Sequence, residues 1–344
     1  FWVCGMLLVP PPKPALTLHR ERNGWCIGSA QLWLALELKN LRYETVRVLA
    51  SDAPALHWPD GTVQTDSVAA IRALDAAHPA AVPLWPPAGI EAARVTDMVD
   101  AFDATMPDAR ESTRAAYLFC REEGFHYDPL PRETFVATLD ETERLLGLSP
   151  GPFFCGGSFS AADVVWAPVL ERYAAQLPSL HSGLRPRGGG AWPRLAHWYA
   201  AMERGVPAYA CRVRGDAPSW RKVLSSSPWW PAGWPPRGGP DERGDPRGGA
   251  LALGEAEAEA AYGGTAVAPA VWAEYAAGRP EVAATPAAEA AAALQRNGAA
   301  VARDARARGA LPAGASEAAY CAALRGVAVE LVRLGEEQAT EAEK

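Results

Sequence analysis

Residues 23–39, with the sequence NGWCIGSAQLWLALELK, decide how this chain is expected to fold. Leu32 and Leu36 recur at helical spacing, so a helix should follow the strand that we predict from Leu16–His19, with Cys26 at the junction. A thiol at a helix N-terminus faces unpaired backbone N–H groups and the positive end of the helix dipole, and both favour the thiolate. The sequence therefore predicts an exposed, reactive cysteine where a strand gives way to a helix.

Further elements of an α/β unit follow, up to about residue 85. Tyr43–Leu49 is predicted to be a second strand, which closes a βαβ unit. Ala55–Trp58 and Thr62–Gln64 indicate a β-hairpin, because an Asp-Gly pair lies between them. Asp66 and Ser67 then begin a helix with apolar residues on one face.

From residue 90 to about residue 224 the pattern predicts helices only. The predicted segments lie near 90–106, 110–124, 131–147, 160–176, 191–204 and 216–225. Ser160 is followed three residues later by Asp163, a spacing that suits a reciprocal capping box. We therefore expect the fourth helix to begin directly after Ser160.

Residues 225–249 are rich in Pro, Gly and Trp, and this composition cannot supply a packed core. We interpret them as a linker. Its tryptophans, Trp229, Trp230 and Trp234, are expected to pack onto the neighbouring helical domain, with a docking site as the alternative.

Residues 250–344 are predicted to form an Ala-rich helical extension. Its last segment carries an apolar seam at spacings of four and three, made by Tyr320, Leu324, Val327, Leu331 and Leu334. Leu294 and Val301 lie seven apart in the segment after Pro286 and offer the matching surface. Because the seam is short, we prefer an intramolecular helical hairpin to an intermolecular coiled coil.

Composition and charge narrow the classes of function. The 344 residues carry a net charge of −7 with a pI near 5.5, which argues against nucleic acid as a partner. No run approaches the roughly 20 apolar residues that a membrane-spanning helix needs, so no transmembrane span is expected. Residues 1–14 form an apolar, Pro-rich N-terminal arm, which we interpret as the stub of a longer segment, a docking arm or a strand over the core.

The cysteines and histidines argue against disulfides and metals. Six cysteines are scattered without CxxC spacing, and none of the six histidines lies at ligand or triad spacing with another. We therefore expect no metal site and a reducing compartment. That compartment is the cytoplasm or, since the chain begins with Phe1 and its natural start is expected upstream, the plastid stroma after loss of a targeting peptide.

Two stretches are similar to the glutathione S-transferase superfamily: residues 18–26 (LHRERNGWC) and residues 151–163 (GPFFCGGSFSAAD). The resemblance covers roughly residues 15–224. It implies a thioredoxin-like glutathione-binding domain at 15–85, of class α/β, followed by an all-α C-terminal domain at 90–224. A cysteine at the catalytic position resembles the omega and lambda-like classes, whose chemistry is thiol transfer and glutathione-dependent reduction.

The resemblance makes Cys26 the catalytic residue, which would form a mixed disulfide with glutathione, and assigns Trp25 beside it to glutathione binding. Ser29 stands where many relatives have a second thiol, so no resolving cysteine exists and a dithiol mechanism is excluded at this site. The alternative for Cys26 is a small buried hydrophobe, as most free cysteines are.

The remaining glutathione contacts implied by the resemblance lie in two later segments. Ala53 and Pro54 fall where the family has its cis-proline, beside backbone that pairs with the cysteinyl part of glutathione. Asp66 and Ser67 fall on the acid-Ser pair that holds the γ-glutamyl group, although an ordinary helix cap would use the same atoms. Only residues 50–53 separate Leu49 from Pro54, too few for the helix that in the family helps to grip the glycyl end of glutathione.

Two functions of different class follow from these observations. The first is a monothiol glutathione transferase or thiol transferase acting on a small electrophile or a mixed disulfide through Cys26. The second is a non-catalytic scaffold or linker subunit of a larger, organellar complex. The missing helix, the arm, the Trp-rich linker and the extension favour the scaffold, whereas Cys26, Pro54 and the Asp66-Ser67 pair favour the enzyme.

Overall fold

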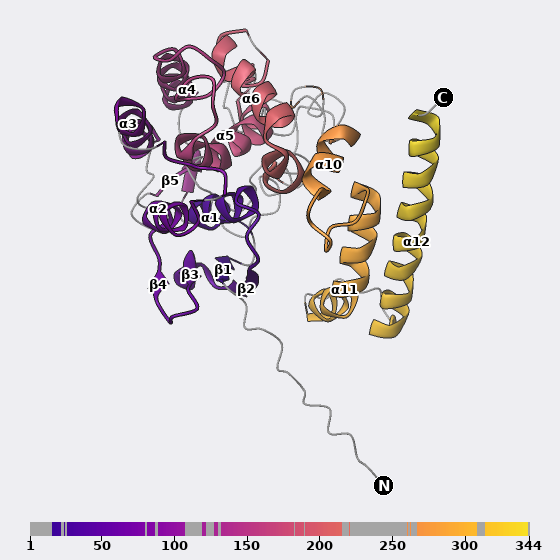
Figure 1. The fold of residues 1–344 in the computed structure, drawn as a ribbon. Coiled ribbons are helices and arrows are strands. Elements are labelled where there is room, and N and C mark those ends of the chain that lie inside the picture. The colour runs from indigo at the N-terminus through magenta and orange to yellow at the C-terminus, as the bar shows by residue number, and fades with distance from the viewer. Residues whose placement is uncertain are drawn as a thin grey trace. The chain divides into compact units, whose positions relative to one another are not determined.

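The computed structural model divides into two compact units, Phe1–Thr265 and Ala266–Lys344, which are described separately (Figure 1). The structure describes residues 16–21, 24, 26–79, 81–86, 89–106, 119–121, 127–129, 132–181, 183–188, 190–214, 220, 260, 262, 267–307 and 314–342. Our interpretations of the N-terminal arm, of Trp25 and of the three linker tryptophans fall outside these residues. Among the described residues, no helix is both long and apolar enough to span a bilayer.

The first unit begins with a four-stranded mixed sheet in the order β2-β1-β3-β4. Its strands are β1 (Thr17–Glu21), β2 (Glu44–Val48), β3 (Ala55–His57) and β4 (Val63–Gln64). β1 is parallel to β2 and antiparallel to β3, which in turn pairs with β4 as the predicted hairpin. The thioredoxin-like arrangement expected from the sequence is confirmed.

Two helices lie together on one face of this sheet (Figure 1). They are α1 (Ile27–Leu38) and α2 (Ser67–Ala77). Leu18 and Leu56, paired across β1 and β3, are fully buried along with Leu32 of α1 and Leu74 of α2. Between β2 and β3 the chain makes a single 3₁₀ turn, Ala50–Asp52, as the short spacing between Leu49 and Pro54 predicts.

The helical part of the first unit contains α3 (Ile90–Thr105), α4 (Arg132–Leu146), α5 (Ala161–Leu180), α6 (Pro193–Gly205) and a π-helical turn η2 (Tyr209–Val213). At its centre is α5, where every residue from Ala161 to Ser179 is buried. Trp166 Nε1 of α5 donates to the Met98 carbonyl of α3 at 2.8 Å, which joins the two helices.

The prediction of a helix over 110–124 is wrong where the structure describes that segment. Phe119–Arg121 forms strand β5, paired antiparallel with β6 (Tyr127–Pro129). Aromatic residues such as Phe119 and Tyr127 favour strands. The helical spacing of apolar residues in 110–124 is weak, and pairing with the nearby β6 outweighs it.

The capping box at the start of α5 is confirmed. The buried Asp163 carboxylate accepts hydrogen bonds from Ser160 N at 3.0 Å, from Phe154 N at 3.2 Å and from Trp198 Nε1 of α6 at 2.8 Å. Burial nevertheless raises the pKa of Asp163 from 3.8 to about 6, against the lowering effect of these donors. The same carboxylate therefore caps α5 and joins it to α6.

The second unit contains α10 (Pro269–Ala276), α11 (Pro286–Ala307) and α12 (Glu317–Ala342). The predicted helical hairpin is confirmed, since α11 packs along α12. The predicted seam is wrong at Val327 and Leu334, which are 51% and 42% exposed. Ala328 is buried in place of Val327, because small residues let the two helices approach closely. Gly335 shows how close this approach is, since a Cβ added there would lie 2.7 Å from Ala287 Cβ.

Candidate functional site

Cys26 is the N-cap of α1, as predicted. Its backbone is extended, with φ −69° and ψ 117°, and its Sγ accepts a hydrogen bond from Ser29 N at 3.4 Å. The prediction of an exposed thiol is wrong, because Cys26 is only 5% exposed. The residue instead contributes to the wall of a pocket of about 800 Å³.

This pocket brings together most of the site residues that the sequence suggests. Cys26, Ala53, Pro54, Asp66 and Ser67 all line it, although they come from three separate segments of the chain. The peptide bond between Ala53 and Pro54 is cis. Whether these residues bind glutathione stays a prediction.

Gly28, in the first turn of α1, lies next to Pro54 and Ser67. A Cβ added at Gly28 would lie 2.8 Å from Pro54 Cγ and 3.2 Å from Ser67 Oγ. Only glycine therefore lets the first turn of α1 approach Pro54 and Ser67 without displacing them. The sequence analysis gave Gly28 no role, because its neighbours come from Pro54 and from the start of α2.

Asp66 caps α2, and Ser67 begins it. The Asp66 carboxylate accepts from Ala69 N at 2.7 Å, which is the ordinary cap of a helix N-terminus. The Ser67 hydroxyl donates to Gln31 Oε1 at 2.7 Å. Asp66 itself is exposed, so its carboxylate remains accessible from solvent.

Gln31 links the site to the helical domain. This buried side chain of α1 accepts from Ser67 and donates from Nε2 to the Val165 carbonyl of α5 at 2.9 Å. Gln31 was not among the predicted site residues. Its position could have indicated a role, because a polar side chain on the apolar face of a helix needs a buried hydrogen-bond partner.

The wall opposite Cys26 comes from the helical domain and was also missed. Val99, Asp100, Phe102 and Asp103 of α3 and Val165 of α5 line the same pocket. The wall thus combines apolar side chains with two carboxylates. Such a surface suits a ligand with an apolar body and a polar or basic group.

Gly24, two residues before Cys26, is held by Arg172, which was also not predicted to belong to the site. Arg172 of α5 is buried, and its Nη2 donates to the Gly24 carbonyl at 3.1 Å. Its guanidinium also lies 4.7 Å from the centre of the Trp220 ring, and Gln176 Nε2 donates to the Trp220 carbonyl at 3.0 Å. Trp220 is therefore connected through α5 to Gly24, two residues before the cysteine.

An ion pair between Lys39 and Asp75 holds the segment at Leu84 and Trp85, which leads from the sheet domain to the helical domain. Lys39 Nζ lies 2.7 Å from the Asp75 carboxylate, which also accepts from the backbone N–H groups of Leu84 and Trp85. Burial opposes ionisation of Asp75, but the Lys39 hydrogen bond and the two N–H donors lower its pKa overall. The described residues contain no group of three or more His, Cys, Asp or Glu side chains placed to hold a metal ion.

Comparison with known proteins gives the following similarities. Residues 126–201 match a family described as "Glutathione S-transferase, C-terminal domain". Glutathione transferase Omega 2S from Trametes versicolor is similar in structure, with a TM-score of 0.50 and 16% identity over 64% of this chain and 100% of that one. Glutathione transferase Omega 3C from the same fungus has a TM-score of 0.48 and 18% identity over 61% of this chain and 89% of that one.

A theta-class glutathione S-transferase from Xanthomonas axonopodis pv. citri, solved with glutathione bound, gives a TM-score of 0.43 and 21% identity over 59% of this chain and 99% of that one. No curated protein sequence matches significantly. At these identities the similarity to Omega 2S shows a shared fold. Substrate and mechanism have to be argued from the residues of this chain.

Proposed function

We propose that this chain is a glutathione S-transferase of the monothiol type, a glutathione-dependent transferase or thiol transferase that uses Cys26. The match of residues 126–201 to the C-terminal domain of the family and the fold shared with Omega 2S support the proposal. The observation that carries the proposal is the position of Cys26 at the N-terminus of α1 and in the wall of the pocket. Helix N-termini stabilise negative charge, here the charge that sulfur carries when it attacks or leaves. A cysteine at this position resembles the omega and lambda-like classes.

The pocket suits glutathione as the co-substrate. The backbone of Ala53, next to the cis-proline, can pair with the cysteinyl part of the tripeptide. The N-terminus of α2, with the Ser67 hydroxyl and the exposed Asp66 carboxylate, offers N–H donors to the γ-glutamyl carboxylate and a negative charge to its ammonium group. These contacts would place the glutathione thiol toward Cys26.

The reaction we propose uses one protein thiol. The Cys26 thiolate attacks the glutathione sulfur of a mixed disulfide, the original S–S bond breaks, and the substrate leaves as a thiolate that takes up a proton. A second glutathione thiolate then attacks the adduct, which releases oxidised glutathione and restores Cys26. Ser29 cannot resolve the adduct within the chain, because it carries a buried hydroxyl in place of a thiol.

The experiment that tests this function measures glutathione-dependent reduction of a small mixed disulfide. We expect turnover by the wild type and none by Cys26→Ser, while both proteins are retained on immobilised glutathione. Cys155→Ser is the matched control, since burial raises the pKa of the Cys155 thiol to about 11 and leaves it protonated at neutral pH. Equal turnover by the wild type and Cys26→Ser would contradict the proposal.

A second candidate is a non-catalytic scaffold or linker subunit, located in an organelle such as the plastid. It is favoured by the 3₁₀ turn at Ala50–Asp52, which replaces a helix expected to grip glutathione, and by the added unit at 266–344. A scaffold should lose its protein partner when 266–344 is deleted and keep it in Cys26→Ser. Co-purification from native lysate of these two variants and the wild type distinguishes the two functions.

A further inference from the structure

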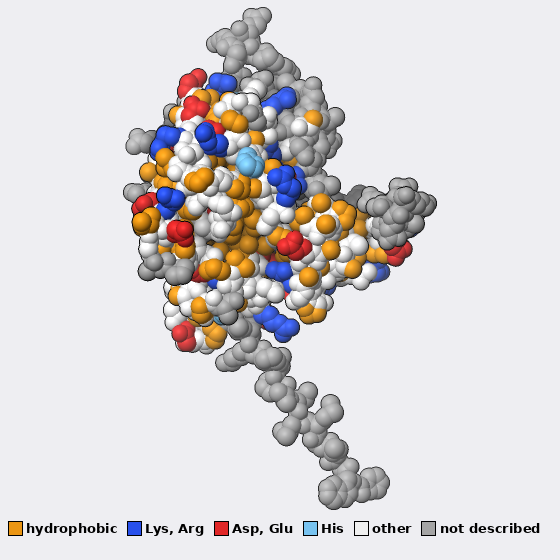
Figure 2. All heavy atoms as spheres, turned by 45° about the horizontal axis from the view of Figure 1, so that its top comes forward, with side chains coloured by type: hydrophobic (Ala, Val, Ile, Leu, Met, Phe, Trp, Pro, Cys, Tyr) orange, Lys and Arg blue, Asp and Glu red, His pale blue; other side chains and the backbone are white. Residues whose placement is uncertain are grey.

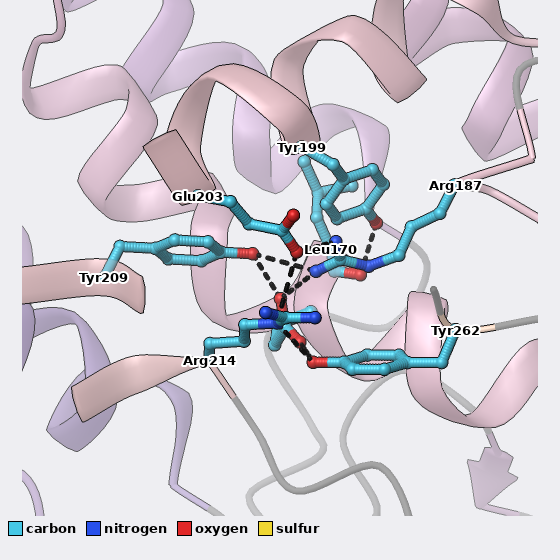
Figure 3. Close-up of polar contacts among 8 residues, drawn as sticks. Leu170, Arg187, Tyr199, Glu203, Tyr209, Arg214 and Tyr262 are labelled. Atoms are coloured by element: carbon cyan, nitrogen blue, oxygen red, sulfur yellow. Dashed lines mark hydrogen bonds and ion pairs between the residues drawn. The ribbon is translucent and has the colours of Figure 1, made fainter. Parts of the chain in front are cut away.

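A cluster of acidic, basic and phenolic side chains lies in the helical part of the first unit, and neither the sequence analysis nor the proposed reaction uses it (Figure 3). The side chains come from α5, from the loop after it, from α6, from η2 and from a position far along the chain. They are Glu171, Arg187, Tyr199, Glu203, Tyr209, Arg214 and Tyr262.

The centre of the cluster is the Glu171 carboxylate of α5, which is 2% exposed. Its Oε2 accepts from Arg187 Nη2 at 2.9 Å and from the Tyr209 hydroxyl. Its Oε1 accepts from the Tyr262 hydroxyl. Loss of the Tyr262 side chain would therefore remove this hydrogen bond from the buried Oε1, which costs free energy.

Two guanidinium groups lie over the Tyr262 ring. The carbon at the centre of the Arg187 guanidinium is 4.7 Å from the ring centre, and that of Arg214 is 5.2 Å away. Arg214 Nε also lies 3.3 Å from the Tyr262 oxygen and 3.2 Å from a Glu203 oxygen. The ring is therefore held by cation–π contacts while its hydroxyl is held by the carboxylate.

Tyr262 reaches this site from a distant part of the chain. It is 91 residues from Glu171 and 48 from Arg214, yet it is fully buried in the first unit (Figure 3). The other members of the cluster lie between Glu171 and Arg214 in the sequence. They are carried by α5, by α6, by the loop that joins these two helices, by η2 and by the residue directly after η2, none of which includes Tyr262.

We propose that Glu171, Arg187 and Arg214 form a binding site for a phenol ring, and that Tyr262 is its intramolecular ligand, which the site holds in the helical part of the first unit. The site selects a phenol over a plain aromatic ring because it combines two cations over the ring with a carboxylate at the hydroxyl. Burial and the neighbouring Glu171 raise the pKa of Tyr262 above its usual range. The hydroxyl therefore keeps the proton that it donates to Glu171.

Chemical rescue of a truncated side chain tests the proposal. Tyr262→Gly in the full chain removes the ring, and p-cresol, the free tyrosine side chain, is added at millimolar concentrations while the thermal midpoint is followed. A ligand that binds the folded state raises the midpoint. Because a hydrogen bond to a charged group is involved, p-cresol should bind roughly tenfold or more tightly than toluene, which lacks the hydroxyl.

Wild type, whose site is filled, and Phe135→Gly, which empties a buried ring position of α4 whose native side chain has no hydroxyl, are the controls and should show no preference for p-cresol. Equal rescue of Tyr262→Gly by toluene, or no rescue by either compound, would overturn the proposal. If Tyr262→Gly does not fold, Tyr262→Phe removes the hydroxyl alone. It should lower the thermal midpoint, and an unchanged midpoint would equally refute the assignment.

Discussion

Gly28→Ala tests whether the close approach of α1 to Pro54 and Ser67 builds the pocket. The new methyl group would lie 2.8 Å from Pro54 Cγ, 3.2 Å from Ser67 Oγ and 3.3 Å from Ser67 Cβ. A separation under 3 Å forces something to move, and neither the proline ring nor the first residue of α2 is a flexible side-chain end. The first turn of α1, which carries Cys26 at its cap, must therefore shift.

The expected magnitude is the difference of two effects. Overpacking of this kind costs about 1–3 kcal/mol. Replacing glycine by alanine in a helix gains up to about 1 kcal/mol in propensity. We therefore expect Gly28→Ala to lower the free energy of unfolding by up to about 2 kcal/mol, and also to weaken retention on immobilised glutathione.

Gly326→Ala is the matched control. Gly326 lies within α12, and a Cβ added there meets no heavy atom within 4 Å, so this substitution should stabilise the protein by about 0.5–1 kcal/mol. Urea denaturation of both variants and the wild type measures the two effects. If Gly28→Ala is as stable as Gly326→Ala and binds glutathione as the wild type does, the close approach has no consequence and the reasoning fails.

Three further predictions follow from buried contacts. Gln31→Ala removes the hydrogen bonds to Ser67 and to the Val165 carbonyl, so we expect a loss of about 1–3 kcal/mol in urea denaturation; a loss below about 0.5 kcal/mol would contradict this role. Asp163 has a pKa of about 6 in the folded protein against 3.8 ordinarily, so its contribution to stability is complete below pH 3.8 and is lost as the pH rises through 6. Free energies of unfolding measured from pH 4 to 7 should show this fall, up to about 3 kcal/mol, in the wild type but not in Asp163→Asn. Gly335→Ala places a Cβ 2.7 Å from Ala287 and should lower the thermal midpoint, whereas an unchanged midpoint would show that α11 and α12 are not closely packed there.

Local sequence patterns were sufficient for the elements that build the Cys26 side of the pocket. The helix after Cys26, the Asp-Gly hairpin and the capping box at Ser160 each depend on residues within a few positions of one another, and the structure has all three. The expected thioredoxin-like domain and helical domain follow from these elements together with the family resemblance.

Contacts between distant segments could not be predicted in the same way. The role of Gly28 depends on Pro54 and Ser67, and that of Gln31 depends on a carbonyl of α5 134 residues away. Tyr262 was placed in an extension by its composition, yet it is buried in the first unit beside Glu171. The hairpin of the second unit was predicted from apolar size, whereas Ala328 and Gly335 set its register because they are small.

The charges on one face of the molecule give little further guidance to function. On the face shown in Figure 2, Lys and Arg side chains are interspersed with Asp and Glu side chains. A face on which both signs of charge are interspersed presents no strong field of a single sign to a partner. The case for a thiol transferase therefore depends on the pocket around Cys26.

Intact mass after treatment with oxidised glutathione tests the central claim most directly. The protein is incubated under native conditions, separated from excess reagent and weighed, with Cys26→Ser in parallel. A monothiol enzyme should gain one glutathione per chain at Cys26, stable until reduced glutathione is added, and Cys26→Ser should gain none. An internal disulfide without added glutathione, or an adduct that persists in Cys26→Ser, would contradict the account.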